Sequence, residues 1–149
     1  MEAYLEKMKT MELEEPADLS ILQRIEKKYN LSLPADYIQF MLLHNGGEGP
    51  VGEYGYLAVF GTDEIEQFHQ EAGIGAALPP FFFFASDRSG YLYAYDYRDS
   101  DIKIVEVPDN ISEMNEIKTV ATSFSEFIDY IYNIDDSEYE DILSDGEQN

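Results

Sequence analysis

The segment at residues 81–97, FFFFASDRSGYLYAYDY, constrains the fold of this chain more than any other part of its sequence. Four consecutive phenylalanines are too apolar for the surface of a soluble domain. After the polar turn residues Asp87, Arg88, Ser89 and Gly90, tyrosine occupies every second position, which is the period of a β-strand. The pattern predicts a β-hairpin with strands at 81–86 and 90–97, whose phenylalanines belong mostly to the core.

Apolar periodicity places further elements before and after this hairpin. Two helices are predicted over 16–29 and 35–44. A third is predicted to begin at a Thr62 cap and to end before Gly73. A fourth is predicted from Ser123 onward, where Ser123 and Glu126 form a capping box. Strands are predicted at 56–60, 102–107 and 117–121. The glycine-rich segment 45–55 is predicted to be a loop. Together these elements predict an α+β fold with a central, mainly antiparallel sheet flanked by helices.

A length of 149 residues fits one domain with a real core. This domain is predicted to span residues 1–134. Residues 135–149 form an acidic C-terminal extension, in which Ser137 and Glu140 repeat the capping pattern ahead of an apolar pair. A short docked helix that ends at Gly146 is therefore one interpretation of the extension.

The net charge is −22, from nine lysines and arginines against thirty-one aspartates and glutamates. A field of this sign repels nucleic acid and anionic membranes and attracts basic proteins, although acidity can also serve solubility alone. The chain has no cysteine, which excludes disulfides and thiolate zinc sites. The charged N-terminus predicts neither a signal peptide nor a membrane span, so we expect a cytoplasmic location.

Several patterns resemble chemical motifs but lack their context. Residues 47–52 match GxGxxG, yet the segment follows a predicted helix and carries a proline and a glutamate, which does not suit a phosphate loop. His44 and His69 lie on different predicted helices, without a second ligand at metal-binding spacing. The acids after the tyrosine strand lack the glycine and distal glutamate of an EF-hand, and no catalytic constellation accompanies them. We therefore expect no metal, no cofactor and no catalytic residue.

The alternating tyrosines leave two interpretations open. Tyr91, Tyr93, Tyr95 and Tyr97 project to one side of their strand. Either helices cover this side and the hydroxyls stay at its rim, or part of the row remains exposed beside the acids. Exposed tyrosines ringed by carboxylates suit a partner rich in lysine or arginine, because tyrosine brings a large contact area with few rotatable bonds.

Four segments together resemble a known family. They are LPADYIQFMLLHNGGEG, TDEIEQF, FFFFASDRSGYLYAYD and VATSFSEFIDYI, and their order is similar to that in the SUKH superfamily. This superfamily includes yeast cell-wall assembly regulators and many bacterial immunity proteins, and the resemblance covers about residues 16–134. It implies an α+β fold with an antiparallel sheet and no enzymatic activity. For bacterial members it implies tight binding to a cognate toxin, often a nuclease or a deaminase.

The charge and the resemblance favour the same function, an immunity protein that blocks the basic active-site cleft of a toxin, in particular a nuclease. The alternative is a non-enzymatic regulatory adaptor that organises cellular proteins. Carboxylates would bind lysine or arginine, and tyrosines would supply the desolvated anchors. The sequence leaves the identity of the toxin and the oligomeric state open. The candidate contact residues come from the glycine-rich segment and the hairpin, and they are Glu48, Glu53, Tyr54, Asp87, Tyr91, Tyr93, Asp96 and Asp99.

Overall fold

The computed structural model of the chain describes residues 3–71, 81–108 and 117–135. Within these ranges, seven strands form one sheet in chain order, and every neighbouring pair is antiparallel. This confirms the predicted α+β class. The strands are β1 (Glu12–Leu13), β2 (Gly47–Val51), β3 (Gly55–Val59), β4 (Phe81–Ser86), β5 (Tyr91–Asp96), β6 (Lys103–Pro108) and β7 (Lys118–Ala121). The helices are α1 (Ala3–Lys7), α2 (Leu19–Tyr29), α3 (Ala35–Leu43), α4 (Thr62–Glu71) and α5 (Phe124–Tyr132).

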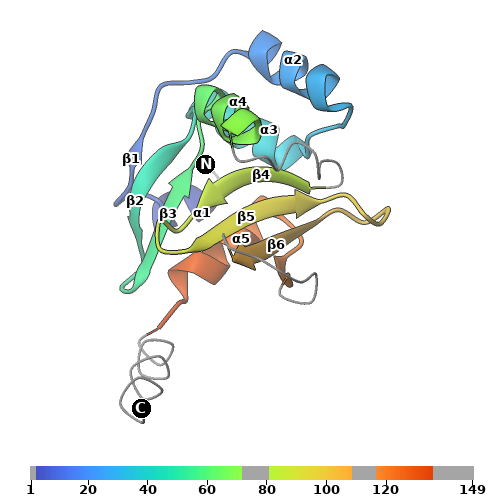
Figure 1. Cartoon of the computed structure of the whole chain (residues 1–149). Helices are drawn as coiled ribbons and strands as arrows, with labels where there is room; N and C mark the ends of the chain where they lie inside the picture. The colour runs from blue at the N-terminus through green and yellow to red at the C-terminus, as the bar shows by residue number, and fades with distance from the viewer. Residues whose placement is uncertain (1–2, 72–80, 109–116, 136–149) are drawn as a thin grey trace.

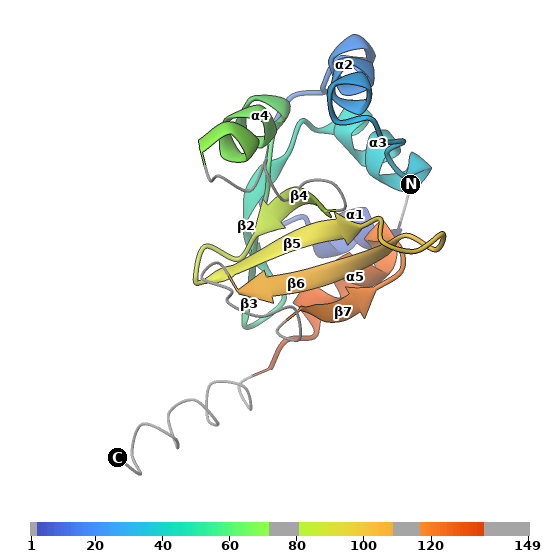
Figure 2. The same ribbon diagram turned by 45° about the vertical axis from the view of Figure 1, so that its right-hand side comes forward.

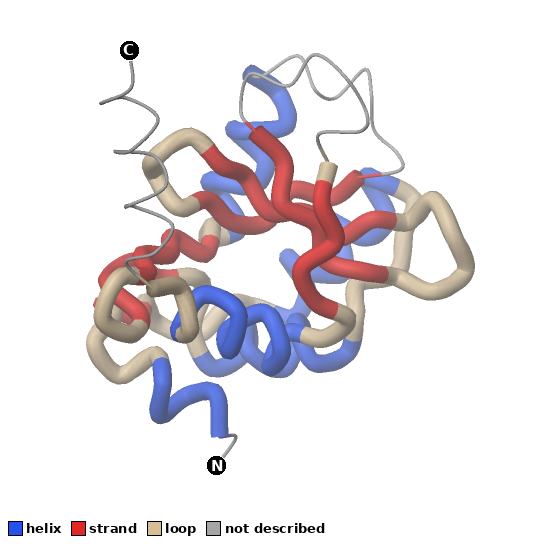
Figure 3. Tube along the Cα trace, turned by 90° about the horizontal axis from the view of Figure 1, so that it is seen from below, coloured by secondary structure: helices blue, strands red, loops and turns tan. Residues whose placement is uncertain are grey.

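The sheet curves around helix α5. This helix packs against β7 at one edge of the sheet and also against β2 and β3 near the other edge, so the strands between them bend around it. Figure 3 shows the strands arranged in an arc beside the helices. Helix α1 packs against α5, whereas α2, α3 and α4 group together above β4 in the views of Figures 1 and 2. Helices therefore flank the sheet, as the sequence predicts.

The four phenylalanines of residues 81–84 lie in β4, the middle strand of the sheet. Each is at most 8% exposed. The rings of Phe82 and Phe84 contact Tyr37 of α3 at centroid distances of 6.2 and 5.6 Å, whereas Phe83 contacts Phe68 of α4 at 5.7 Å. Aromatic side chains thus cover both sides of this strand. This explains why its sequence does not alternate between polar and apolar residues.

Helix α5 begins at the predicted capping box. Ser123 Oγ accepts a hydrogen bond from the Glu126 amide at 3.1 Å. The Glu126 carboxylate reaches one residue further back than the motif predicts, and accepts bonds from the Thr122 amide and hydroxyl at 2.9 and 2.7 Å. Asp36 of α3 accepts a bond from the Phe124 amide at 2.8 Å. The first turn of α5 is therefore fixed by its own residues and by a second helix.

Helix α4 begins differently from the prediction. Thr62, the predicted cap, is the first residue of the helix. Its amide donates to Asn45 Oδ1 at 2.9 Å, and the Glu64 carboxylate accepts a bond from the Gly61 amide at 3.2 Å. The cap prediction is wrong because a side chain from the segment before β2 supplies the acceptor. The predicted end of this helix, just before Gly73, lies outside the described residues.

The glycine-rich segment contains a strand, which corrects the prediction of a loop. Strand β2 pairs with β1 on one side and with β3 on the other. A Cβ added at Gly47 or Gly49 would overlap backbone atoms of Glu12 or Met11 in the N-terminal segment. Glycine is needed there because this segment, which follows the unpredicted helix α1 and contains the unpredicted strand β1, packs directly on β2. Since β2 leads into another strand, the GxGxxG match lacks the helix that a phosphate loop requires.

The remaining predicted elements are confirmed, with ends that differ by three residues at most. The short helix predicted in the acidic extension lies outside the described residues. Among the residues that are described, no helix is long and apolar enough to cross a membrane.

Candidate functional site

The β4–β5 turn, residues 87–90, has the geometry that its sequence predicts. The Asp87 carboxylate accepts hydrogen bonds from the amides of Ser89 at 2.8 Å and Tyr91 at 3.0 Å. Gly90 has a φ of +119°, and Arg88 also has a positive φ, 61°, which is uncommon for a residue with a side chain. The Asp87 carboxylate is therefore engaged within the turn. Tyr91 is 43% exposed and presents its ring to solvent.

The β2–β3 turn carries two further candidates, Glu53 and Tyr54, and both are exposed. The turn rests on the C-terminal end of α5, because a Cβ added at Gly52 would overlap the carbonyl oxygen of Tyr132. Tyr132 is exposed as well. The close contact between Gly52 and the end of α5 thus holds two exposed tyrosines, Tyr54 and Tyr132, at the same end of the molecule.

Strands β1 and β2 each present a glutamate on neighbouring positions, next to a tyrosine of β3. Glu12 of β1 lies directly opposite Glu48 of β2 in the strand register, an arrangement of like charges that lowers the stability of a sheet. The hydroxyl of Tyr56, on β3, donates to Glu48 Oε2 at 2.8 Å. This hydrogen bond is the main cause of the lowered pKa of Glu48, and it raises the pKa of the Tyr56 hydroxyl in turn. The Tyr56 ring nevertheless remains 39% exposed.

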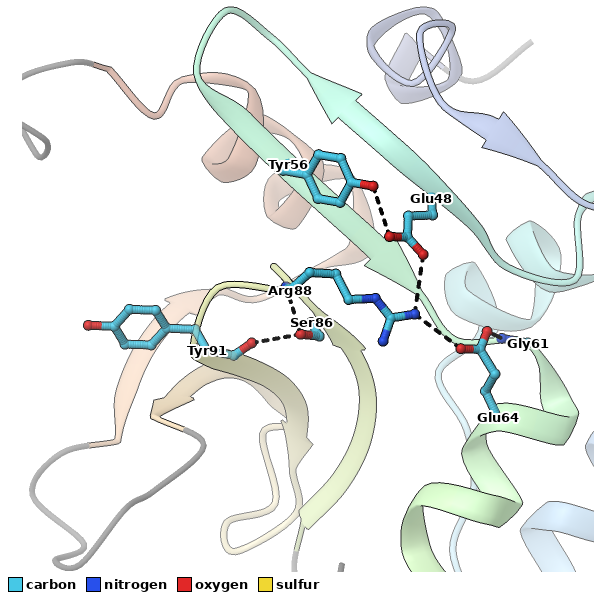
Figure 4. Close-up of polar contacts among 7 residues, drawn as sticks. All are labelled: Glu48, Tyr56, Gly61, Glu64, Ser86, Arg88 and Tyr91. Atoms are coloured by element: carbon cyan, nitrogen blue, oxygen red, sulfur yellow. Dashed lines mark hydrogen bonds and ion pairs between the residues drawn. The ribbon is translucent and has the colours of Figure 1, made fainter.

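Arg88 reaches from the β4–β5 turn to two carboxylates (Figure 4). Its Nη2 donates to Glu48 Oε1 and to Glu64 Oε2, at 3.2 Å each. Partial burial alone would lower the pKa of the guanidinium, but the two glutamates outweigh it and raise that pKa. The guanidinium carbon also lies 5.8 Å from the centre of the Phe60 ring. Arg88 therefore links the β4–β5 turn to β2 and to the first turn of α4.

A hollow of about 320 Å³ opens between β1, β2, β3 and the first turn of α4. Glu48 and Glu64 bind Arg88 there, whereas the carboxylates of Glu12 and Glu14 make no hydrogen bond or ion pair within residues 3–71, 81–108 and 117–135. We call this the acidic hollow. Its lining residues are Glu12, Glu14, Gly47, Glu48, Tyr56, Val59 and Glu64.

The candidates Asp96 and Asp99 lie at the other end of the β4–β5 hairpin, away from the acidic hollow. Asp96 is 7% exposed, and its two carboxylate oxygens accept hydrogen bonds of 2.9 to 3.2 Å from the Arg98 guanidinium. Burial would raise the pKa of Asp96, but the hydrogen bonds from Arg98 outweigh it and lower the pKa. Asp99 is exposed and pairs with Lys103 at 3.7 Å. Burial and internal pairing thus leave the Asp96 carboxylate little surface for a partner, and its role as a contact residue stays a prediction.

Tyr93 likewise offers a partner almost no surface, because helices cover its side of the sheet. It is 1% exposed, and Tyr95 is 2% exposed. Tyr93 packs against Phe127 of α5 at a centroid distance of 5.0 Å, and its hydroxyl donates to Glu106 at 3.1 Å. Of the two interpretations of the tyrosine row, coverage by helices is therefore correct for Tyr93 and Tyr95, while Tyr91 at the strand end stays exposed.

The structure brings Glu48 together with residues that the sequence analysis does not identify. Glu12 and Glu14 come from an N-terminal segment with no clear strand period, and Tyr56 and Glu64 belong to elements whose contact depends on the fold. The sequence gives one indication of such a contact. Arg88 is one of only nine lysines and arginines, and it lies in a turn between segments that contain acids. Its partners cannot be identified from spacing, since Glu48 and Glu64 lie 40 and 24 residues away along the chain.

A second hollow, of about 690 Å³, lies beside α2 and is lined by residues that include Arg24 and Lys27. Arg24 donates to Glu66 at 2.6 Å, and Lys28 pairs with the same carboxylate at 3.5 Å. The pair with Glu66 offsets the charge of Arg24, and among the described residues that line this hollow Glu26 supplies a single carboxylate.

Comparison with protein families gives a match over most of the chain. A model described as the SMI1 / KNR4 family (SUKH-1) matches residues 16–130. A search of curated proteins found no match. The matched range contains Glu48, Tyr56, Glu64 and Arg88, whereas β1, with Glu12, lies before it.

Proposed function

Because the chain belongs to the SMI1 / KNR4 family (SUKH-1), which includes toxin-immunity proteins, we propose that it binds and neutralises a cognate bacterial toxin. The toxin we propose is a nuclease, whose basic active-site cleft the protein blocks without chemistry of its own. Members of the family are generally non-enzymatic immunity or regulatory proteins. We propose that the protein acts in the cytoplasm, where a nuclease toxin would meet its substrate.

The observation that supports this proposal is the combination of exposed tyrosines and carboxylates at one end of the sheet. The strand register brings the β2–β3 and β4–β5 turns to the same end. There, Tyr54, Tyr56 and Tyr91 are between 39% and 43% exposed, and Tyr56 lines the acidic hollow. Aromatic residues dominate the energy of protein interfaces when a partner desolvates them, and carboxylates select a basic partner.

The physical mechanism follows from what a nuclease must present to its substrate. A surface that binds phosphates is rich in lysine and arginine, and an inhibitor can offer carboxylates to those side chains in place of phosphates. The surplus of 22 negative charges on this chain would steer such a surface toward it over several ångströms. Steering raises the association rate, and dissolved salt weakens it.

Co-expression tests the proposal directly. We expect cells that produce the toxin encoded beside this protein to survive only when the protein is present. Purified toxin and protein should form a stable complex whose association rate falls at least about tenfold from low to high ionic strength. Absence of protection would reject the immunity function and favour a regulatory adaptor. Protection combined with a salt-independent association rate would retain immunity and reject the electrostatic mechanism.

A further inference from the structure

We propose that Asn45 is a site of spontaneous deamidation and that the native fold suppresses this reaction. Asn45 is the one asparagine in this sequence that is followed by glycine. Glycine has no side chain to shield its amide nitrogen or to restrict the backbone, so an asparagine before it reacts most readily in a flexible chain. The contacts of Asn45 in the folded protein determine whether the reaction can proceed there.

The reaction joins two neighbouring groups of the chain. The backbone nitrogen of Gly46 gives up its proton to solvent and attacks Cγ of Asn45, a new C–N bond forms, and the side-chain nitrogen leaves as ammonia. Water then opens the resulting cyclic imide at either of its carbonyls. One opening gives aspartate. The other gives isoaspartate, in which the main chain runs through the former side chain and is longer by a methylene group.

The first observation that supports the proposal is the attachment of the Asn45 side chain to α4. Its Oδ1 accepts a hydrogen bond from the Thr62 amide at 2.9 Å, and its Nδ2 donates to Thr62 Oγ1 at 3.3 Å. Thr62 is 2% exposed, so water competes poorly for these bonds. Ring closure expels Nδ2 and turns Oδ1 together with Cγ, so the reaction breaks both bonds.

The second observation is that the attacking nitrogen is engaged as well. The Gly46 amide donates to the His44 carbonyl oxygen at 2.7 Å, and the Gly46 carbonyl accepts from the Glu14 amide at 3.0 Å. Gly46 is buried at a φ of +82°, and a Cβ placed there would overlap backbone atoms of Val59 and Gly61. Ring closure requires movement of the peptide group between residues 45 and 46, and this close packing opposes it. The fold therefore holds both reacting groups.

The reaction is accordingly confined to chains in which this segment has opened. Its two products differ in their consequences. Aspartate keeps an oxygen that can accept from the Thr62 amide, and it places a negative charge at the N-terminal end of α4, where the helix dipole favours it. Isoaspartate lengthens the main chain directly before Gly46 and shifts β2 against β1 and β3. A chain that stays unfolded is thus converted in part into a form that cannot regain the native sheet.

Peptide mapping by mass spectrometry tests the site. The whole chain is incubated at mildly alkaline pH, in buffer and in guanidinium chloride. We expect conversion of Asn45 to be at least about tenfold faster in the denaturant. In the denatured chain it should also be faster than at Asn30 and Asn133, which precede leucine and isoleucine. Equal rates at Asn45 in buffer and denaturant would overturn the proposal, as would equal rates at the three asparagines in the denatured chain.

Substitution of Thr62 tests the source of the protection. Thr62→Val removes the acceptor for Asn45 Nδ2, so we expect about threefold faster conversion in buffer and an unchanged rate in denaturant. The control is Thr122→Val, which removes a hydroxyl that donates to Glu126 at the start of α5. Thermal melting gives the stability of each variant. Equal acceleration by both would mean that overall stability protects Asn45, and would overturn the assignment to Thr62.

Refolding tests the difference between the two products. Chains aged in denaturant are diluted into buffer, folded chains are separated from those that do not refold by size-exclusion chromatography, and both pools are mapped. We expect isoaspartate at position 45 in the pool that does not refold, and aspartate in the folded pool. Asn45→Asp, the control for the aspartate product, should refold as the native chain does. Equal isoaspartate in both pools would overturn the proposed loss of refolding.

Discussion

His69 shows how burial decides the charge of a single residue in this protein. It stacks on Phe82 with ring centroids 5.6 Å apart, and its Nε2 lies 3.3 Å from the Phe83 carbonyl oxygen. Its Nδ1 is buried without a hydrogen-bond partner in the described part of the chain. Burial disfavours the charged imidazolium and lowers the pKa of His69, and the hydrogen bond to Phe83 opposes this only in part. Burial therefore favours the neutral form of His69 in the folded protein.

A loss of stability as the pH falls below about 7 should follow from this lowered pKa. Below about pH 6.5 the unfolded chain binds a proton at His69, whereas the folded chain does not, so the free energy of unfolding falls as the pH falls. Denaturant titrations at fixed, moderate salt should show this slope, and His69→Gln should flatten it. The control is His44, which is only half-buried and whose Nδ1 lies 2.9 Å from the Glu14 carbonyl oxygen. An equal flattening by His44→Gln would contradict the assignment to His69.

At the scale of elements, the position of the β2–β3 turn depends on contact with α5. Gly52 has a φ of +75°, and a Cβ there would meet the backbone of Tyr132. Gly90, in the β4–β5 turn, has a positive φ of +119° but no atom near the place of a Cβ. The two glycines thus share a backbone requirement and differ in crowding, which makes them a matched pair.

Substitution by alanine separates these two effects. Gly90→Ala should cost about 1 kcal/mol of unfolding free energy, the cost of a left-handed conformation with a side chain. Gly52→Ala should cost at least about 3 kcal/mol, because the turn must also move away from α5. Urea unfolding measures both values. Equal costs for the two variants would mean that the β2–β3 turn is not held by α5.

Local signals explain which elements are predictable from the sequence. The β4–β5 hairpin and the start of α5 are predicted because their turn and cap residues bind within their own segments. Strand β2 is not predicted, because glycine by itself predicts a loop. Gly47 and Gly49 instead allow a close approach by residues that are more than 30 positions away along the chain. The N-terminal elements α1 and β1 are short, and their structure depends on packing against α5 and β2.

The same distinction applies to the candidate site. Alternation correctly gives the side of β5 on which Tyr93 lies, but it cannot tell whether a helix covers that side. Glu48 is predicted from its charge and its place in a glycine-rich segment. Its partners Arg88 and Tyr56, and the free carboxylates of Glu12 and Glu14, are brought to it by the order of the strands, which requires the tertiary structure.

At the scale of the whole molecule, self-repulsion opposes the compact state. Thirty-one acids face nine bases, so most carboxylates have no cation to pair with. The ion pairs that do form lie largely at the surface, such as Arg88 with Glu48 and Lys103 with Asp99. Exposed pairs of this kind contribute about 0 to 1 kcal/mol each, so screening them costs little. Screening the surplus charge should therefore be the larger effect.

Added salt is accordingly expected to stabilise this protein. Sodium chloride should raise the melting temperature steadily up to physiological ionic strength, and the rise should level off as repulsion is screened. Choline chloride at equal ionic strength is the control, because its cation is too large and too weakly binding to occupy a specific carboxylate site. A rise with sodium alone would indicate bound cations instead of screening. A fall in melting temperature with both salts would show that the ion pairs outweigh the repulsion.

The strands of the sheet follow one another in space as they do along the chain, from β1 to β7. Each strand can therefore pair with the one made just before it, and no crossover has to wait for a distant segment. Topologies in which paired strands are also neighbours in sequence tend to form quickly, and this holds best here for β2 with β3 and for β4 with β5, whose connections are short turns, whereas helices separate β1 from β2 and β3 from β4. The proposed function, neutralising a toxin, requires that the protein fold before the toxin acts, and pairing of strands in chain order favours early folding.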